Sequence, residues 1–138
     1  MLSKGDESTW NTMLQRYMAE SNAQEKIKLL KGLAWINQPW MIRQFLRLAK
    51  NETIVRGQDY LLCLRYIAQN PIGLPIVWEF IRDDWEYLVE RFSLNDRYLG
   101  RMPKYIAYTF SSQLRLDELL AFYKKYPKAG AGMSIIQI

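Results

Sequence analysis

The 138-residue sequence predicts an all-α fold of about seven short helices. Apolar residues recur at spacings of three and four along most of the chain, which is the period of a helix buried on one side. Capping residues, prolines and glycines divide this pattern into segments. No alternating pattern typical of strands precedes the C-terminus. Because short turns join the segments, we expect antiparallel helix pairs stacked as a HEAT-like or armadillo-like solenoid.

The first two helices are expected on either side of residue 21. The first spans residues 9–20 and follows a flank at 1–8. Ser21 or Asn22 is predicted to cap the second helix, with Gln24 or Glu25 three residues on as the reciprocal partner. The expected inward residues are Trp10, Met13, Leu14 and Tyr17 in the first helix, and Ile27, Leu30, Leu33 and Ala34 in the second.

The third and fourth helices are bounded by prolines. Pro39 fits the first turn of a helix and is predicted to open the third. The fourth spans about residues 58–69 and ends before Asn70, because a residue that precedes proline avoids the helical region. The expected inward residues are Trp40, Ile42, Phe45, Leu46 and Ala49, then Leu61, Leu64, Ile67 and Ala68. Cys63 lies among leucines, which indicates a buried and inert thiol.

The clearest helical segment spans residues 74–92 and is predicted to be one helix. Its apolar stripe consists of Leu74, Val77, Trp78, Ile81, Trp85, Leu88 and Phe92. Because Trp78 and Trp85 belong to this stripe, we expect both in the core rather than in a ligand-stacking box. Asp83 and Asp84 point about 100° apart on a helix, so we expect a solvated surface rather than a carboxylate pair.

The sixth and seventh helices are predicted from capping residues. Asn95 or Asp96 caps the sixth, although Gly100 and Pro103 are expected to loosen or delay its start. Ser111 or Ser112 introduces the seventh, which Pro127 and the following glycines end. The expected inward residues are Met102, Ile106 and Phe110, then Leu116, Leu119, Leu120 and Tyr123.

Composition excludes several classes of protein. Hydrophobic residues make up 49% of the chain, which argues against disorder. No window is apolar enough to span a bilayer and no signal peptide opens the chain, so the chain alone is expected in the cytoplasm. The net charge is +5, and its two basic groups alternate with apolar residues as on solvated helix faces. They are Lys26, Lys28 and Lys31, then Arg43, Arg47, Lys50 and Arg56. We therefore expect no nucleic-acid binding.

The chain contains no histidine, so histidine-dependent catalysis is excluded. Neither a Ser-His nor a Cys-His nucleophile pair can form, and a single cysteine cannot build a structural zinc site. Lysine or carboxylate catalysis stays formally open, but the acids are scattered over helix exteriors. We therefore predict no catalytic residue and no metal ligand in this chain.

Four motifs lie along the chain: Asn-Pro-x-Gly with the Trp-rich helix at 70–92, and the stretches at 21–26, 95–101 and 126–132. Together they resemble the C-terminal helical domain of the M1 family of zinc aminopeptidases. The resemblance covers residues 10–132 and is greatest to the members that remove acidic N-terminal residues. It implies a domain at 9–132, whereas the family's final helix is missing and 133–138 form a divergent tail.

The resemblance implies a non-catalytic role. In this family the zinc lies in an upstream catalytic domain, which would be this domain's partner, and the helical domain supports folding and walls the peptide substrate chamber. Arg97 and Arg101 match one family motif, and their guanidinium groups could bind an acidic substrate there. Their alternative role is pairing with helix acids such as Asp96. Alone, the chain is expected to be inactive.

The resemblance also predicts a location and an assembly. The parent enzyme would be a type II membrane protein at the extracellular face of the plasma membrane, with its membrane anchor far upstream of this domain. A homodimer is the possible assembly. Asn51-Glu52-Thr53 is a glycosylation triplet that agrees with this location. The alternative function is a stand-alone helical-repeat scaffold that binds protein partners.

Overall fold

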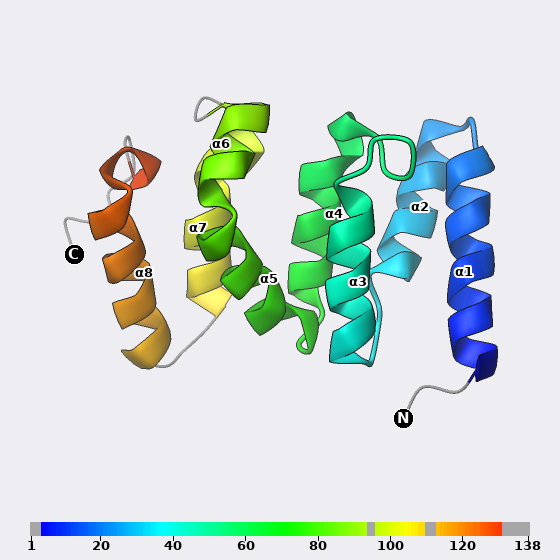
Figure 1. Cartoon of the computed structure of the whole chain (residues 1–138), viewed down its shortest axis with the longest axis horizontal. Coiled ribbons are helices and arrows are strands. Elements are labelled where there is room, and N and C mark those ends of the chain that lie inside the picture. Colours follow the sequence, from blue (N-terminus) through cyan, green and yellow to red (C-terminus); the bar gives the residue numbers. More distant parts are fainter. Residues whose placement is uncertain (1–3, 94–95, 110–112, 131–138) are drawn as a thin grey trace. The chain divides into compact units, whose positions relative to one another are not determined.

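The computed structural model describes residues 4–93, 96–109 and 113–130, and these form eight α-helices and one 3₁₀ helix (Figure 1). The α-helices are α1 (Lys4–Ala19), α2 (Ala23–Leu33), α3 (Pro39–Ala49), α4 (Gly57–Gln69), α5 (Gly73–Asp83), α6 (Trp85–Phe92), α7 (Arg97–Thr109) and α8 (Gln113–Lys125). The 3₁₀ helix is η1 (Pro127–Gly130). None of the described residues forms a strand. The predicted all-α class is confirmed, and eight α-helices stand in place of about seven because the Trp-rich segment forms both α5 and α6.

The chain divides into two compact units, residues 1–77 and 78–138. In the first unit, consecutive helices from α1 to α4 run in opposite directions (Figure 1). α2 contacts α1 and α4, and α3 contacts α4. The indole of Trp10 packs edge-on against Phe45 at 5.2 Å and donates a hydrogen bond to the Leu33 carbonyl at 3.0 Å. Antiparallel neighbours therefore share one apolar core in this unit.

The helix starts in the first unit follow the predicted capping chemistry, with one exception. Asn22 caps α2 by accepting a hydrogen bond from the Glu25 N–H at 3.0 Å. Pro39 occupies the first turn of α3 as predicted. α1, in contrast, begins at Lys4, five residues before the predicted start at Thr9. The polar residues before Trp10 offered no apolar periodicity from which to predict this earlier start.

Asn70 connects two loops of the first unit. It is 3% exposed, and its Nδ2 donates to the carbonyls of Ala34 at 3.2 Å and Ile36 at 2.7 Å. Its Oδ1 accepts from the Ile72 N–H at 3.1 Å. One side chain thus satisfies three backbone groups that helices cannot pair, and it fixes the end of α4 to the turn between α2 and α3.

The Trp-rich segment is two helices rather than one. Asp84 separates α5 from α6 with φ −106° and ψ 16°, outside the helical region. The backbone hydrogen bonds continue through this break. The Asp84 N–H donates to the Phe80 carbonyl and the Leu88 N–H donates to the Asp84 carbonyl, both at 2.9 Å. The apolar stripe therefore keeps its direction, and Trp78 and Trp85 are buried as predicted, at 0% and 2% exposed.

The second unit is built around Phe122 on α8. α7 contacts both α6 and α8, and η1 packs on α8. The Phe122 ring lies 5.1 Å from the Trp85 ring and 5.3 Å from the Tyr126 ring. Arg82 and Trp78 both bind Glu118 on α8, at 3.1 Å and 3.3 Å. Aromatic packing and one half-buried ion pair thus attach α8 to the preceding helices.

Several predicted inward residues lie at the surface instead. Trp40 is 47% exposed, and Leu116 and Leu120 are 43% and 47% exposed. On α3 the buried arc is centred on Met41, Ile42, Phe45, Leu46 and Ala49, and Trp40 lies outside it. On α8 the core side includes Phe122, which the predicted stripe omitted. Phe110, Ser111 and Ser112 lie outside the described residues.

Candidate functional site

The start of α7 holds the arginines that are predicted to face a substrate chamber. Asp96 caps this helix, because its Oδ1 accepts from the Leu99 N–H at 3.1 Å. α7 begins at Arg97 and continues through Pro103, so the expected delay at Gly100 and Pro103 is wrong. An intact first turn places Arg97 and Arg101, four residues apart, on one face of the helix.

Arg101 is exposed, and it forms no ion pair with any residue that the structure describes. Arg97 lies at the first position of α7, but its side chain is outside the described part. One oxygen of the Asp96 carboxylate, named above as an alternative partner, accepts the capping hydrogen bond. The structure therefore leaves the Arg101 guanidinium accessible, and its binding of substrate stays a prediction.

A turn at Ser93 sets the geometry before α7. Ser93 has φ 76°, in the left-handed region that residues other than glycine rarely adopt. Its N–H donates to the Val89 carbonyl at 2.8 Å, which ends α6, and its carbonyl accepts from the Asp96 N–H at 3.1 Å. The capping residue of α7 is thus held by the end of α6.

Asn51 lies exposed in the turn after α3, where a modifying enzyme could reach it. Its Oδ1 accepts from the Thr53 N–H at 2.9 Å and from the Thr53 hydroxyl at 2.7 Å. Both bonds use the oxygen of the amide, so they do not occupy Nδ2, the atom to which a glycan would be attached. The geometry is compatible with the predicted modification.

The described residues offer no group suited to metal binding. Among them, no three His, Cys, Asp or Glu side chains come together. Cys63 is fully buried as predicted, and burial raises the pKa of its thiol well above the ordinary value. In the same described part, no helix is both long and apolar enough to cross a bilayer.

A buried polar cluster joins α1, α2 and α4, and the sequence did not reveal it. The Tyr17 hydroxyl donates to Asp59 Oδ2 at 2.6 Å, and Arg56 pairs with the same oxygen at 3.0 Å. Lys26 Nζ donates to the Tyr17 carbonyl and lies 3.9 Å from the centre of the Tyr17 ring. The cluster therefore brings two cations and one carboxylate together around a single tyrosine.

Burial changes the protonation equilibria of this cluster. Lys26 is only 6% exposed, so its predicted place on a solvated face is wrong. Burial, followed by the charge of Arg56, lowers the Lys26 pKa below its ordinary value. Burial and the hydrogen bond to Asp59 raise the Tyr17 pKa. Because Tyr17, Lys26 and Asp59 are all buried, we regard the cluster as structural rather than catalytic.

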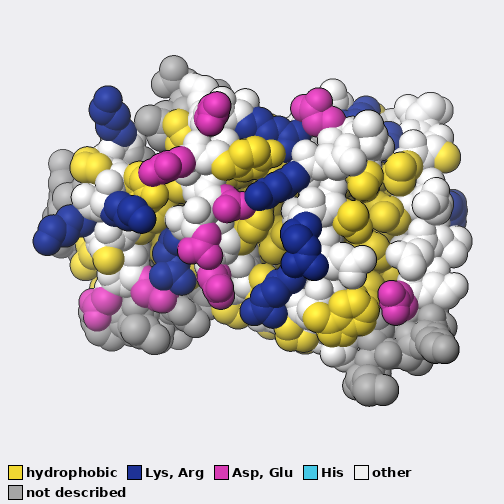
Figure 2. All heavy atoms as spheres, viewed as in Figure 1, with side chains coloured by type: hydrophobic (Ala, Val, Ile, Leu, Met, Phe, Trp, Pro, Cys, Tyr) yellow, Lys and Arg dark blue, Asp and Glu magenta, His cyan; other side chains and the backbone are white. Residues whose placement is uncertain are grey.

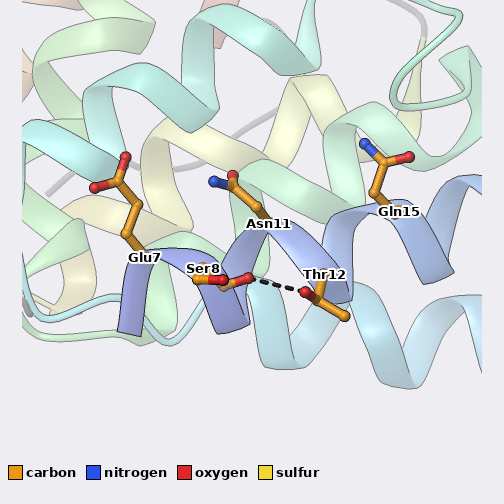
Figure 3. Close-up of a pocket in the computed structure, with 5 residues that line it drawn as sticks. All are labelled: Glu7, Ser8, Asn11, Thr12 and Gln15. Atoms are coloured by element: carbon orange, nitrogen blue, oxygen red, sulfur yellow. Dashed lines mark hydrogen bonds between the residues drawn. The ribbon is translucent and has the colours of Figure 1, made fainter. Parts of the chain in front are cut away.

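The outer face of α1 forms a shallow polar depression (Figure 3). Its lining residues are Glu7, Ser8, Asn11, Thr12 and Gln15. The Thr12 hydroxyl donates to the Ser8 carbonyl at 3.0 Å, which is a bond within the helix. Glu7, Asn11 and Gln15 extend from α1 in nearly the same direction and do not converge on a point (Figure 3). This face therefore lacks the arrangement of a catalytic site.

Comparisons with known proteins cover almost the entire chain. A family model described as "ERAP1-like C-terminal domain" matches residues 1–138. Aminopeptidase A of Gloydius brevicauda is 45% identical over 132 residues, and glutamyl aminopeptidase of Homo sapiens is 41% identical over 132. Both comparisons cover 96% of this chain but 14% of the relative. Endoplasmic reticulum aminopeptidase 1 of Mus musculus is 25% identical over 128 residues, 93% of this chain and 14% of its own length.

Proposed function

We propose that this chain, which belongs to the family of ERAP1-like C-terminal domains, is the non-catalytic helical domain of a zinc aminopeptidase that removes acidic N-terminal residues. The family match over residues 1–138 carries the proposal. It confirms the resemblance to the helical domain of M1 aminopeptidases, and the 45% identity to aminopeptidase A confirms the predicted likeness to glutamyl aminopeptidases. The chain spans 14% of the length of that relative.

In this proposal the domain works through partners. The upstream M1 catalytic domain holds the zinc and binds the peptide, while the helices stabilise it and wall its chamber. The lack of histidine in this chain supports the placement of the zinc in another domain, because zinc peptidases hold the metal through imidazole ligands. The parent enzyme forms a homodimer at the extracellular face of the plasma membrane, and a glycan on Asn51 accompanies this location.

The division of labour is tested with the purified chain. We expect no hydrolysis of glutamyl or alanyl p-nitroanilide above the buffer rate, with or without added zinc. The control is full-length Mus musculus glutamyl aminopeptidase under the same conditions, since it is 42% identical to the chain over 132 residues. Chelator-sensitive hydrolysis by the chain alone would overturn the proposal.

The role of the arginines is tested in a chimera. The chain replaces the matched segment of the Mus musculus enzyme, and Arg97→Ala and Arg101→Ala are compared with Arg16→Ala on α1. Loss of a charged hydrogen bond to the substrate carboxylate is expected to raise KM for the glutamyl substrate roughly tenfold, with little change for alanyl. An equal change for both substrates would show a structural role instead.

A second candidate function, the protein-binding scaffold, is favoured by the outer face of α3. Trp40, Arg43 and Arg47 lie within one arc of this helix, and all three are exposed. α3 contains no acidic residue, and neither arginine forms an ion pair with any described residue. Apolar and charged side chains also lie together on the face drawn in Figure 2. Trp and Arg are enriched among the residues that contribute most to binding at protein interfaces.

This alternative predicts a partner with an acidic surface. In the chimera, the double variant Arg43→Glu/Arg47→Glu is compared with Arg16→Glu, which changes the charge of another exposed helix face. If α3 contacts the catalytic domain, only the double variant lowers the melting temperature of the chimera. If the scaffold role holds, the double variant leaves the melting temperature of the chimera unchanged. The chain then binds a partner unrelated to peptidases, and the double variant abolishes that binding.

A further inference from the structure

A crevice of about 490 Å³ lies in the second unit, between α6 and the end of α8. Its apolar lining consists of Trp85 and Val89 from α6 and Tyr126 and Pro127 from the turn into η1. Phe122 packs against both Trp85 and Tyr126, at 5.1 Å and 5.3 Å between ring centres. The volume falls within the range of small-molecule sites, and the aromatic packing holds the walls in place.

The charges of the crevice are separated between its two elements. α6 contributes the carboxylates of Glu86 and Glu90, four residues apart and therefore on one side of the helix. The end of α8 and η1 contribute the ammonium groups of Lys125 and Lys128. All four side chains are exposed, and no ion pair joins the two pairs within the described residues.

This arrangement is complementary to a molecule with an ammonium group at one end, a carboxylate at the other and apolar groups between. We infer that the crevice binds a short apolar peptide with both termini free. Its N-terminus meets Glu86 and Glu90, its C-terminus meets Lys125 and Lys128, and its side chains lie against the apolar lining of the crevice. The crevice is lined by residues of this chain, and neither Arg97 nor Arg101 is among them, so it does not depend on the proposed catalytic partner or on the chamber arginines.

The inference is tested by titrating the ¹⁵N-labelled chain with leucyl-phenylalanine and following the indole resonance of Trp85 by NMR. A Trp85→Phe variant assigns this resonance. The matched probe is N-acetyl-leucyl-phenylalanine amide, which has the same apolar groups without either charge. We expect a saturable shift with the free dipeptide and roughly tenfold weaker binding of the blocked one, because four exposed charges each contribute modestly.

Two double variants identify the charges that act. Each double variant, Glu86→Gln/Glu90→Gln and Lys125→Gln/Lys128→Gln, should reduce the preference for the free dipeptide over the blocked one. Glu79→Gln and Lys124→Gln, exposed but outside the crevice, should leave binding unchanged. Circular dichroism checks that each variant is folded. Absence of a saturable Trp85 shift, equal binding of the free and blocked peptides, or unchanged binding by both double variants would overturn the inference.

Discussion

Replacing Asp59 by asparagine perturbs the buried cluster at its single carboxylate. Asn has the same shape but no charge, so the Tyr17 hydroxyl and Arg56 both lose an ionised acceptor. Breaking a fully buried pair costs about 3–5 kcal/mol. The Arg56 side chain is 37% exposed and can turn to water, so its share is screened and counts little. The remaining loss is the hydrogen bond from Tyr17, 2.6 Å long and buried, to a charged group. We expect a loss of about 2–3 kcal/mol in the free energy of unfolding.

The assay is urea unfolding of the purified chain, followed by circular dichroism at fixed pH. Tyr17→Phe should cost less than Asp59→Asn, about 1–2 kcal/mol, because Asp59 keeps its bond to Arg56. Lys26→Met should change stability by less than about 1 kcal/mol, because burial already penalises the ammonium group and methionine fills the same space. The Tyr17 carbonyl still accepts from the Glu20 N–H at 3.3 Å in that variant. The reasoning is refuted if Asp59→Asn costs under about 0.5 kcal/mol or if Lys26→Met is the most harmful of the three.

Three further predictions concern single positions. Because burial raises the Cys63 pKa, the folded chain keeps a proton that the unfolded chain releases near the ordinary value of 9.0. The free energy of unfolding is therefore complete below that pH and falls above it. Cys63→Ala should make this fall shallower when urea unfolding is measured as a function of pH. Gly73→Ala places a Cβ against the Ile67 carbonyl oxygen and should lower the free energy of unfolding by about 1–3 kcal/mol. Gly32→Ala meets only a flexible methionine side chain and should lower it by less than about 1 kcal/mol. Thermal unfolding of both variants compares them. When the chain is secreted from mammalian cells, an amidase that removes N-linked glycans should increase its gel mobility, and Asn51→Gln should abolish that increase; an unshifted parental chain would contradict the prediction.

The sequence predicted the helices well where apolar period and capping chemistry agree. Asn22, Pro39 and Asp96 mark three helix starts, and each does so through a local interaction that needs no distant partner. The buried residues of the Trp-rich stripe were predicted for the same reason. The break at Asp84 was missed because the stripe continues in the same direction on both sides of it.

The errors in burial come from tertiary context. A lysine between apolar positions suggests a solvated face, but Lys26 is buried because the Tyr17 carbonyl and ring meet it from α1. Trp40 is the largest apolar residue in the first turn of α3, yet it lies outside the buried arc of that helix. Neither outcome is decided by spacing along one helix, because each depends on which neighbouring helix lies alongside.

The candidate sites differ in what sequence can provide. Arg97 and Arg101 were found through a family motif, and the structure adds an intact helix start and an exposed Arg101. The crevice beside Trp85 combines residues about forty positions apart, from α6 and from the turn into η1. Only a folded chain brings such residues together, so no local pattern could have indicated it.

The most direct test of the central claim measures chelator-sensitive glutamyl hydrolysis in three preparations: the chain alone, the Mus musculus glutamyl aminopeptidase without its matched segment, and the chimera in which the chain replaces that segment. A non-catalytic domain that supports its catalytic partner predicts activity in the chimera and none in the other two. Activity in the chain alone, or a folded chimera as inactive as the truncated enzyme, would contradict the claim.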